Sequence, residues 1–301
     1  MSNPPWWEIQ VTCPADLEDT VFWRLQELGC QGTASMAQGP EWVVVRGYLP
    51  QSERPAGLGQ LTEELLQDAQ ASGLAQPQVV AVTLDPEDWA EHWKRHWQAQ
   101  TIGERLVVLP AWLAPPLGAD QVILRLDPGY AFGTGTHPST QLCLEALEMR
   151  LDPHWRKGPL TVADIGCGSG ILSLAALLLG VEQVYAVDTD PLAVTATRQN
   201  RALNHLDPRH LVVEQGSVER LLTLLPGPLD GFVCNILLDV ILDVVPRLRP
   251  AVHPKTWGIL SGVLTDQVPP LVAGLEKHGW MVAALWQRQG WSCLSIRPNP
   301  D

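Results

Sequence analysis

Residues 162–190 combine the side chains and the spacing best suited to bind a charged ligand (VADIGCGSGILSLAALLLGVEQVYAVDTD). The stretch begins as an apolar strand with Asp164 near its end, followed by a turn that contains three glycines, Gly166, Gly168 and Gly170. After a helix rich in Leu and Ala, a second strand ends at Asp188. A glycine turn between strand and helix lets a ligand approach the backbone closely, and a carboxylate about twenty residues later suits a ribose hydroxyl pair. The pattern predicts a ligand with an adenosine-like end.

The spacing of the glycines favours one cofactor over another. A dinucleotide turn reads G-x-G-x-x-G and places a pyrophosphate over the helix N-terminus. Here the pattern is D-x-G-x-G-x-G. The carboxylate of Asp164 is a poor neighbour for a pyrophosphate but a good one for a moiety that carries an ammonium and a sulfonium. We therefore expect S-adenosylmethionine rather than NAD, bound by Asp164, the three glycines and Asp188.

A second glycine-rich segment, DPGYAFGTGTHPST at 127–140, also carries candidate site residues. No lysine follows its glycines, so it does not match a P-loop. We expect it to form a lid over the cofactor, with Phe132 closing over the methyl group and Thr140 offering its hydroxyl at the start of the next helix. The alternatives are ordinary loop packing for Phe132 and a helix cap made by Ser139 or Thr140. His137 precedes a proline in a loop, which favours a structural role over that of a base.

The composition limits the class of protein. The chain has 301 residues, a net charge of −13 and 46% hydrophobic residues, without an apolar run long enough to span a membrane or a secretory leader at its start. We expect a cytoplasmic enzyme that does not bind nucleic acid directly and that acts either on a small molecule or on a basic macromolecular substrate. The six cysteines lack C-x-x-C spacing, which predicts reduced thiols. His92 and His96 have i, i+4 spacing without a third ligand, so we expect no metal site.

The first 100 residues alternate between strand and helix patterns. The expected order is strand 6–12, helix 15–28, strand 31–38, strand 41–49, helix 58–72 and strand 78–84. This β-α-β-β-α-β order is that of a ferredoxin-like α+β domain. Residues 86–100 follow as a helical pattern with tryptophans four residues apart, which we interpret as a packed interdomain helix.

From residue 106 onward the pattern is that of an α/β domain. Strands are expected at 106–112 and 121–126, and a helix to about residue 150 follows the lid segment. Five strands then alternate with helices, at 160–165, 182–188, 210–214, 229–235 and 256–262, and a hairpin of 280–286 with 291–297 ends the series. A parallel sheet completed by an antiparallel hairpin is a doubly wound, Rossmann-like fold of the class I methyltransferase kind. Asp190, before Pro191, is expected to cap the helix after the second of these strands.

Several motifs taken together resemble one family. DPGYAFGTGTHPST is followed by LCLEAL, DIGCGSGIL, VDTDP, FVCNIL and LSGVL, and DWAEHW and IGERLVVLPAW precede it. Over roughly residues 85–297 the chain resembles the bacterial ribosomal protein L-eleven methyltransferases, the PrmA family. The resemblance implies a class I fold that uses S-adenosylmethionine to methylate amino groups of one ribosomal protein, the α-amine and lysine side chains. It also implies an N-terminal domain that recognises the substrate.

Carried over position by position, the resemblance places Thr140, Gly166, Asp188 and Asn235 against the cofactor. Asn235 ends a strand and is expected to aim the lone pair of the acceptor amine at the methyl group, since no strong base stands out in the sequence. After this residue the family's N-I-L-A-x-P-L reads NILLDVI, without the proline. The domains expected are a ferredoxin-like substrate-recognition domain at 1–85, a helical linker at 86–105 and a methyltransferase domain at 106–301.

Two other functions remain open at this point. A class I methyltransferase with these motifs can act on another protein or on a small molecule, and a chain that kept the fold without catalysis can serve as a ribosome-binding factor. An N-terminal domain of the ferredoxin-like type favours a macromolecular partner over a small molecule. An intact GCGSG turn, with Asp188 and Asn235, argues against the non-catalytic alternative.

Overall fold

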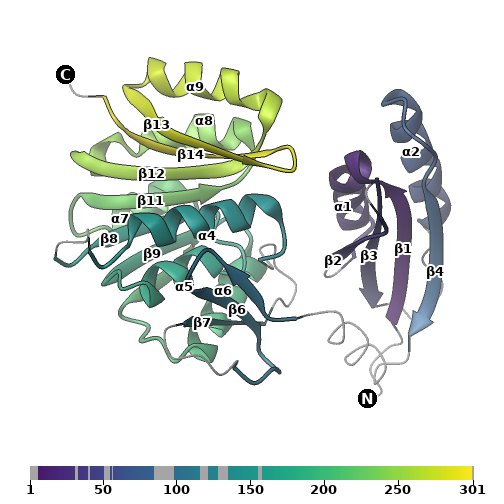
Figure 1. The fold of residues 1–301 in the computed structure, drawn as a ribbon, viewed down its shortest axis with the longest axis horizontal. Coiled ribbons are helices and arrows are strands. Elements are labelled where there is room, and N and C mark those ends of the chain that lie inside the picture. The colour runs from purple at the N-terminus through teal and green to yellow at the C-terminus, as the bar shows by residue number, and fades with distance from the viewer. Residues whose placement is uncertain are drawn as a thin grey trace. The chain divides into compact units, whose positions relative to one another are not determined.

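The computed structural model of the chain describes residues 6–30, 33–39, 41–50, 55, 57–84, 98–115, 121–127, 135–154 and 158–299. The chain divides into two compact units, Met1–Trp97 and Gln98–Asp301 (Figure 1). The division falls within the expected linker 86–105. Residues 85–97, which include His92, His96 and most of the expected linker helix, lie outside the described residues. None of the helices in the described ranges is both long and apolar enough to cross a membrane.

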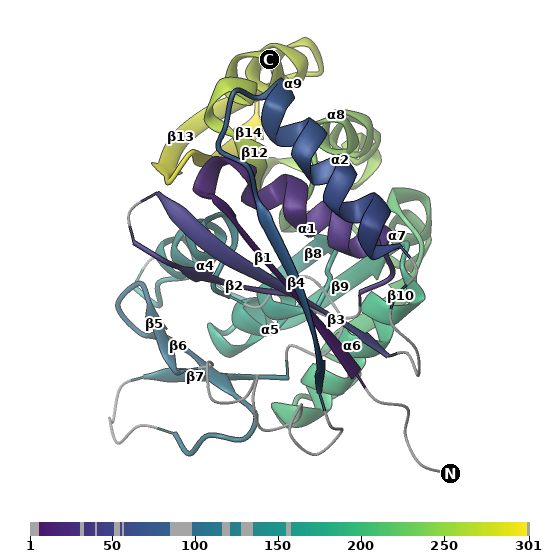
Figure 2. The ribbon, with the colours of Figure 1, turned by 90° about the vertical axis from the view of Figure 1, so that its right-hand side faces the viewer.

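The first unit is an antiparallel sheet with two helices (Figure 2). Its elements are β1 (Trp6–Pro14), a 3-10 turn at Ala15–Leu17, α1 (Glu18–Glu27), β2 (Thr33–Ala37), β3 (Trp42–Pro50), α2 (Leu58–Ala71) and β4 (Gln78–Leu84). The strand order β2-β3-β1-β4 is that of the expected ferredoxin-like fold. Alternate residues of β1, Ile9, Val11 and Cys13, are fully buried in a core shared with both helices, because successive side chains of a strand point to opposite faces.

The second unit is built around a sheet of seven described strands. Its elements are α4 (Pro138–Arg150), β8 (Thr161–Ile165), α5 (Ile171–Leu178), β9 (Gln183–Asp188), α6 (Pro191–Leu203), β10 (Leu211–Gln215), α7 (Val218–Leu224), β11 (Leu229–Asn235), α8 (Leu238–Arg247), β12 (Val252–Leu264), α9 (Val268–Lys277), β13 (Trp280–Arg288) and β14 (Trp291–Pro298). The strand order is β10-β9-β8-β11-β12-β14-β13, and every pair is parallel except those made by β14. The expected hairpin of β13 and β14 is confirmed. Its last strand is inserted between β12 and β13, so β13 lies at the edge of the sheet.

A smaller sheet precedes α4. It contains β5 (Gln100–Ile102), β6 (Leu106–Pro110) and β7 (Val122–Leu126). The end of the expected helical linker, at 100–102, is therefore a strand that pairs with β6. The buried carboxylate of Glu148 on α4 holds the β5–β6 turn, since it accepts the backbone N–H groups of Glu104 and Arg105, each at 2.7 Å. After β7 the chain enters the 127–140 segment, of which 128–134, including Phe132, lie outside the described residues.

Two hydrophobic cores lie on opposite faces of the seven-stranded sheet. Residues of α4, α5 and α6 pack in one core, and residues of α7, α8 and α9 pack in the other (Figures 1 and 2). Neighbouring strand residues enter different cores: Val162 belongs to the first and Ala163 to the second. Strands that are covered on both faces read as nearly continuous apolar runs, which is why the sequence pattern predicted them. The order of the strands reverses between β8 and β11, and a crevice for ligands is expected at the carboxyl ends of these two strands.

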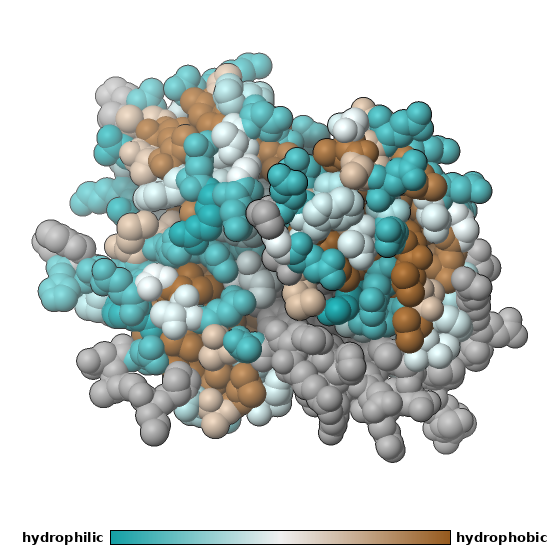
Figure 3. All heavy atoms as spheres, turned by 45° about the vertical axis from the view of Figure 1, so that its right-hand side comes forward, coloured by the Kyte–Doolittle hydropathy of each residue, from teal (hydrophilic) through white to brown (hydrophobic). Residues whose placement is uncertain are grey.

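Exposed apolar side chains occur singly and in small groups, such as Val80 and Val82 on β4. On the face drawn in Figure 3, groups of hydrophobic residues are separated by hydrophilic ones. The described residues with large, exposed apolar side chains are Trp23, Met36, Val80, Val82, Met149, Leu192, Leu237, Val240 and Leu285. Two of them, Leu237 and Val240, lie two and five residues after the end of β11, near the place where the crevice is expected.

Candidate functional site

Three glycines make the turn from β8 into α5. Gly166, Gly168 and Gly170 have φ angles of 75°, 55° and 82°, in the left-handed region that glycine adopts without strain. Gly166 also lacks room for a side chain, because a Cβ there would lie 2.4 Å from the side chain of Ile236. Its backbone N–H donates to the carbonyl of Val187 at 2.9 Å. The turn is thus held between the ends of β9 and β11, the two strands that flank β8.

Asp164 is buried beneath this turn, with 1% of its surface exposed. Its Oδ2 accepts the backbone N–H and the hydroxyl of Ser173, in the first turn of α5, at 3.0 and 2.5 Å. Its Oδ1 is buried and has no hydrogen-bond partner among the described residues. Burial raises the pKa of Asp164 to about 7, while the Ser173 hydrogen bonds oppose this shift and the charge of Asp188 adds to it. A buried carboxylate oxygen of this kind suits a cation or a hydrogen-bond donor.

Asp188 ends β9, next to the carboxyl end of β8. Its Oδ2 accepts the N–H of Gly168 at 2.9 Å, and its Oδ1 accepts the N–H of Asp190 at 3.0 Å. A carboxylate has about four acceptor sites, so these two bonds fix its orientation and leave capacity for hydroxyl donors. Asp190 in turn accepts the N–H of Leu192 at 2.8 Å and is the N-cap of α6, as expected from the proline that follows it.

Asn235 ends β11, which lies on the other side of β8 from β9. Its Nδ2 donates to the hydroxyl oxygen of Thr140 at 3.2 Å, and its Oδ1 is buried without a hydrogen-bond partner among the described residues. Thr140 is itself 1% exposed, so its hydroxyl fixes the orientation of the amide. Asp164 and Asn235 belong to β8 and β11, which are adjacent and parallel. The strand order reverses between these two strands, so both side-chain oxygens lie on strands that flank this point.

His137 makes the N-cap of α4. Its Nδ1 accepts the backbone N–H of Ser139 at 3.3 Å, and its ring meets that of Trp291 edge-on, with centroids 4.6 Å apart and planes at 72°. Burial lowers the pKa of His137 to about 4, so the ring is neutral and a weak base at pH 7. The structural interpretation of His137 is confirmed. The alternative in which Ser139 or Thr140 caps the helix is wrong, and the hydroxyl of Thr140 instead contacts Asn235.

Sequence reasoning missed three polar residues that pack behind the glycine turn: Ser173, Thr197 and Asn200, each no more than 1% exposed. The hydroxyl of Thr197 donates to the carbonyl of Gly168 at 2.9 Å, and Nδ2 of Asn200 donates to the carbonyl of Ser169 at 2.9 Å. A signal for the two α6 residues was available, because they share the buried stripe of this helix with small apolar residues. Polar groups in such a stripe need hydrogen-bond partners, and the nearest unsatisfied backbone groups are those of an adjacent loop.

Phe132, His92 and His96 lie outside the described residues, so the position of Phe132 over the methyl group stays a prediction. Within the described ranges, no group of three or more His, Cys, Asp or Glu residues is arranged to hold a metal ion. All six cysteines are free thiols, and five of them are buried.

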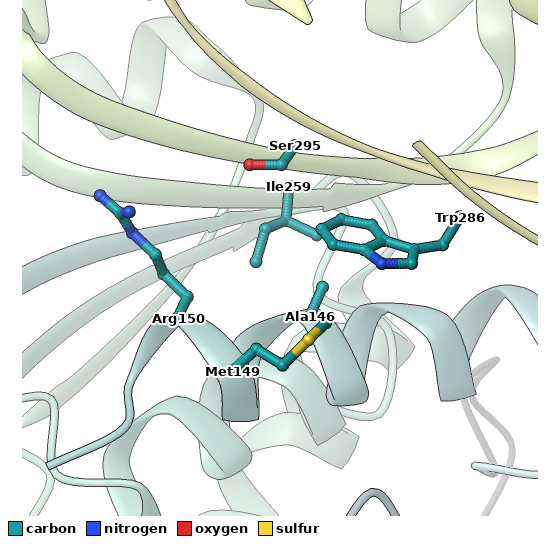
Figure 4. Close-up of a pocket in the computed structure, with 6 residues that line it drawn as sticks. All are labelled: Ala146, Met149, Arg150, Ile259, Trp286 and Ser295. Atoms are coloured by element: carbon teal, nitrogen blue, oxygen red, sulfur yellow. The ribbon is translucent and has the colours of Figure 1, made fainter. Parts of the chain in front are cut away.

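A separate cavity of about 200 Å³ opens between α4 and strands β12 to β14 (Figure 4). It is lined by Ala146, Met149, Arg150, Ile259, Trp286 and Ser295. Figure 4 shows the side chains of Arg150 and Trp286 on opposite sides of Ile259. Thr140 is ten residues from Arg150 along α4, which corresponds to about 15 Å of helix. None of the expected site residues that the structure describes lines this cavity, so it is distinct from the expected site at the strand ends.

The fold and the glycine turn together define a class of protein. Three features are those of the class I methyltransferases: a doubly wound sheet with one reversed strand, β14, near its edge, a glycine turn after β8, and a carboxylate at the end of β9. The family model described as ribosomal protein L11 methyltransferase (PrmA) matches residues 5–299. The chain belongs to the ribosomal protein L11 methyltransferase family, and it is an S-adenosylmethionine-dependent methyltransferase.

Individual relatives agree with this assignment. The chain is 50% identical over 294 residues to the ribosomal protein L11 methyltransferase of a Cyanothece species, with 96% of this chain and 97% of the relative covered. It is 48% identical over 297 residues to that of Thermosynechococcus vestitus, with 97% of each covered. The crystal structure of ribosomal protein L11 methylase from Lactobacillus delbrueckii subsp. bulgaricus superimposes with a TM-score of 0.59 at 32% identity, covering 68% of this chain and 100% of that one.

Proposed function

We propose that this chain transfers methyl groups from S-adenosylmethionine to ribosomal protein L11, at lysine side chains and at the N-terminal α-amine. Membership of the family supports the protein substrate. The structural observation that supports amine methylation most directly is Asn235, whose Oδ1 is buried, unpaired among the described residues and oriented through Thr140. An acceptor at the end of β11 suits an N–H of an amine whose lone pair must face the methyl group.

The residues around the glycine turn fit the cofactor. Oδ1 of Asp164 would face its ammonium, and the remaining acceptor sites of Asp188 would bind the ribose hydroxyls. The turn at Gly166, Gly168 and Gly170 would let the ligand lie against the backbone. When bound, S-adenosylmethionine supplies an electrophilic methyl group on a sulfonium leaving group. The carboxylate of Asp164 beneath this turn disfavours a pyrophosphate, which supports this cofactor over a dinucleotide.

The acceptor amine must be neutral when it reacts. A lysine of ordinary pKa, about 10.4, costs about 4–5 kcal/mol to deprotonate at pH 7, whereas an α-amine of pKa about 8 costs about 1 kcal/mol. His137 does not serve as the base in this scheme, because its pKa is lowered to about 4 and its Nδ1 is engaged with Ser139. The proton leaves to water before transfer, and Asn235 then accepts an N–H of the neutral amine and aims its lone pair in line with the bond that breaks.

The substrate side of the crevice combines apolar and acidic groups. Leu237 and Val240, at the start of α8, are 72% and 44% exposed, and Asp239 between them is also exposed. Such a surface suits a basic segment, because the aliphatic stem of a lysine packs on apolar groups while its charge stays near a carboxylate. The net charge of −13 favours the approach of a basic protein and disfavours nucleic acid. The first unit, over residues 1–85, provides the remaining recognition surface in this proposal, and the reaction takes place in the cytoplasm.

A transfer assay tests the proposal. The purified chain is incubated with methyl-labelled S-adenosylmethionine and ribosomal protein L11, and mass spectrometry of L11 then locates the added methyl groups. We expect label on lysines and on the N-terminal amine, and a large loss of label with Asn235→Ala although this variant still binds the cofactor. If the wild-type chain binds S-adenosylmethionine in calorimetry but transfers no label to L11, the substrate assignment is wrong.

A further inference from the structure

One side chain of α6 contacts two separate segments at the buried side of this helix. The amide of Asn200, 1% exposed, makes three hydrogen bonds. Its Oδ1 accepts the backbone N–H of Asp127 at 2.8 Å, and its Nδ2 donates to the carbonyls of Asp127 at 3.1 Å and Ser169 at 2.9 Å. Asp127 directly follows β7, and Ser169 lies in the glycine turn. Asn200 therefore joins the end of the small sheet to the turn that we assign to the cofactor.

The adjacent carbonyl of the turn is also held by α6. The hydroxyl of Thr197 donates to the carbonyl of Gly168 at 2.9 Å, next to the bond that Asn200 makes with Ser169. Because each peptide unit is planar, fixing two successive carbonyls fixes the planes of two successive peptides in the turn. Asp188 accepts the N–H of Gly168 from the other side, so the carboxylate assigned to the ribose is oriented by the same turn.

A neighbouring asparagine provides an internal comparison. Asn204, one helical turn later on α6, pairs with Arg125 in the same way: its Oδ1 accepts the backbone N–H at 2.8 Å and its Nδ2 donates to the carbonyl at 2.6 Å. Its remaining bond, from Nδ2 to the backbone carbonyl of Asn200 at 2.8 Å, stays within α6. Both asparagines thus hold β7 against α6, and Asn200 additionally contacts the glycine turn.

We propose that Asn200 is a positioning residue for cofactor binding, which holds the glycine turn at a fixed place relative to β7 and α6. It acts through the backbone of Ser169 and touches neither the cofactor nor the acceptor. Since α6 begins at its N-cap Asp190, two residues after Asp188, a turn that shifts relative to this helix also shifts relative to the ribose-binding carboxylate. The proposal uses the cofactor of the family and is independent of which protein accepts the methyl group.

Asn200→Ala and Asn204→Ala are matched variants that test this role. Asn204→Ala removes an amide that pairs with the backbone of Arg125 in β7, and Asn200→Ala removes one that pairs with the backbone of Asp127, directly after β7. Only Asn200→Ala also removes a hydrogen bond to the glycine turn. We expect both to lower the Tm. Asn200→Ala should also raise the Kd for S-adenosylhomocysteine, measured by calorimetry, about fivefold to tenfold, as for the loss of one buried hydrogen bond, and Asn204→Ala should change it by less than about twofold.

Two further measurements separate positioning from general destabilisation. For Asn200→Ala the KM for S-adenosylmethionine should rise while kcat at saturating cofactor stays near the wild-type value, whereas partial unfolding would lower kcat and leave KM unchanged. In the cofactor-free protein, amide hydrogen exchange at residues 168–171 should be faster in Asn200→Ala than in Asn204→Ala. If Asn200→Ala does not fold, Asn200→Ser, which keeps one donor, takes its place in the same comparisons.

Either of two results would overturn the role of Asn200: equal losses of cofactor affinity in both alanine variants, or a folded Asn200 variant with wild-type affinity. A wild-type chain that fails to bind S-adenosylhomocysteine would overturn the cofactor assignment and this role together. A chain that shows the expected difference in affinity but does not methylate ribosomal protein L11 would support the role of Asn200 and contradict the proposed substrate alone.

Discussion

Cofactor affinity should fall as the solution is acidified, because the carboxylate of Asp164 must be ionised to attract a cation. Its Oδ1 is buried and unpaired among the described residues, and its Oδ2 accepts two bonds from Ser173. Burial raises the pKa of Asp164 to about 7, so the cofactor-free protein holds this group partly protonated near neutral pH. A cation bound beside Oδ1 favours the ionised form, and binding therefore releases a proton.

The size of the effect follows from the ionised fraction of Asp164. With a pKa of about 7, roughly one tenth of the carboxylate is ionised at pH 6 and about nine tenths at pH 8, which alone would make the Kd about tenfold higher at pH 6 than at pH 8. Deprotonation of about half of the cofactor's α-ammonium at pH 8 reduces the expected difference to about fivefold. Asp164 should release nearly one proton for each cofactor bound at about pH 6, whereas at about pH 8 it releases almost none and the partly deprotonated α-amine of the cofactor should instead take up a proton on binding. The α-ammonium of the cofactor loses its own proton near pH 8, so affinity should be highest between about pH 7 and 8.

Isothermal titration calorimetry in buffers of different ionisation enthalpy measures both the affinity and the proton release. S-adenosylhomocysteine is the matched ligand, because it carries the ammonium but no sulfonium. The same dependence with both ligands would place the ammonium beside Asp164. Asp164→Asn should bind both ligands more weakly and lose the dependence below pH 7. A wild-type Kd that is constant from about pH 6 to 8, or a dependence that persists in Asp164→Asn, would refute the reasoning.

Three further predictions concern stability, chemistry and substrate binding. Because the folded-state pKa of Asp164 is raised, the folded chain binds more protons than the unfolded chain between about pH 4 and 7. The cofactor-free protein should therefore lose at most about 4 kcal/mol of its free energy of unfolding as the pH rises through this window. Urea unfolding of Asp164→Asn should lack that loss, and an equal loss in the variant would contradict the assignment. Asn235→Ala should lower the single-turnover rate constant for transfer about 100-fold, a much larger effect than its effect on the Kd for cofactor, and Thr140→Val, which removes the hydroxyl that orients the amide, should lower this rate constant about tenfold. Leu237→Ala should raise the KM for ribosomal protein L11 up to about tenfold. The control Met149→Ala, which removes a 53% exposed side chain on α4, should leave this KM unchanged. Equal effects of the two variants would argue against a substrate surface at Leu237.

The local elements of the site were predictable because short-range sequence determines them. A turn whose three glycines have φ angles between 55° and 82° requires glycine at those positions, so D-x-G-x-G-x-G identifies it directly. The place of the last strand was not predictable in the same way. Hairpin spacing shows that β13 pairs with β14, but either strand can then face β12. The burial of Ser292, Cys293 and Leu294 on both faces of β14 explains why this strand lies inside the sheet, and that burial depends on the helices that cover it.

The partners of the site side chains could not be read from the sequence, because they come from distant parts of the chain. Thr140 and Asn235 are 95 residues apart, and Asn200 and Asp127 are 73 apart. Residue type made Thr140 and Asn235 candidates, but only the packing of α4 against the sheet brings their side chains together. The same packing places the ring of His137 against Trp291, which gives a physical reason for its neutral, structural state.

Two buried oxygens without a hydrogen-bond partner among the described residues indicate how the site relates to the reaction. Oδ1 of Asp164 and Oδ1 of Asn235 belong to adjacent strands, and a buried acceptor without a partner costs about 1–3 kcal/mol. Packing for stability alone would pair such groups, so their positions are better explained by the two ligands of a methyl transfer. The methyl donor carries a cation that Asp164 can bind, and the acceptor amine carries an N–H that Asn235 can bind. Cofactor alone should then raise the Tm by satisfying Asp164, and an amine-bearing substrate should raise it further by satisfying Asn235. Differential scanning fluorimetry should show that Asp164→Asn greatly reduces the increase in Tm caused by the cofactor, and that Asn235→Ala greatly reduces the further increase caused by the amine-bearing substrate. If each variant reduced both increases equally, the two oxygens would not serve separate ligands.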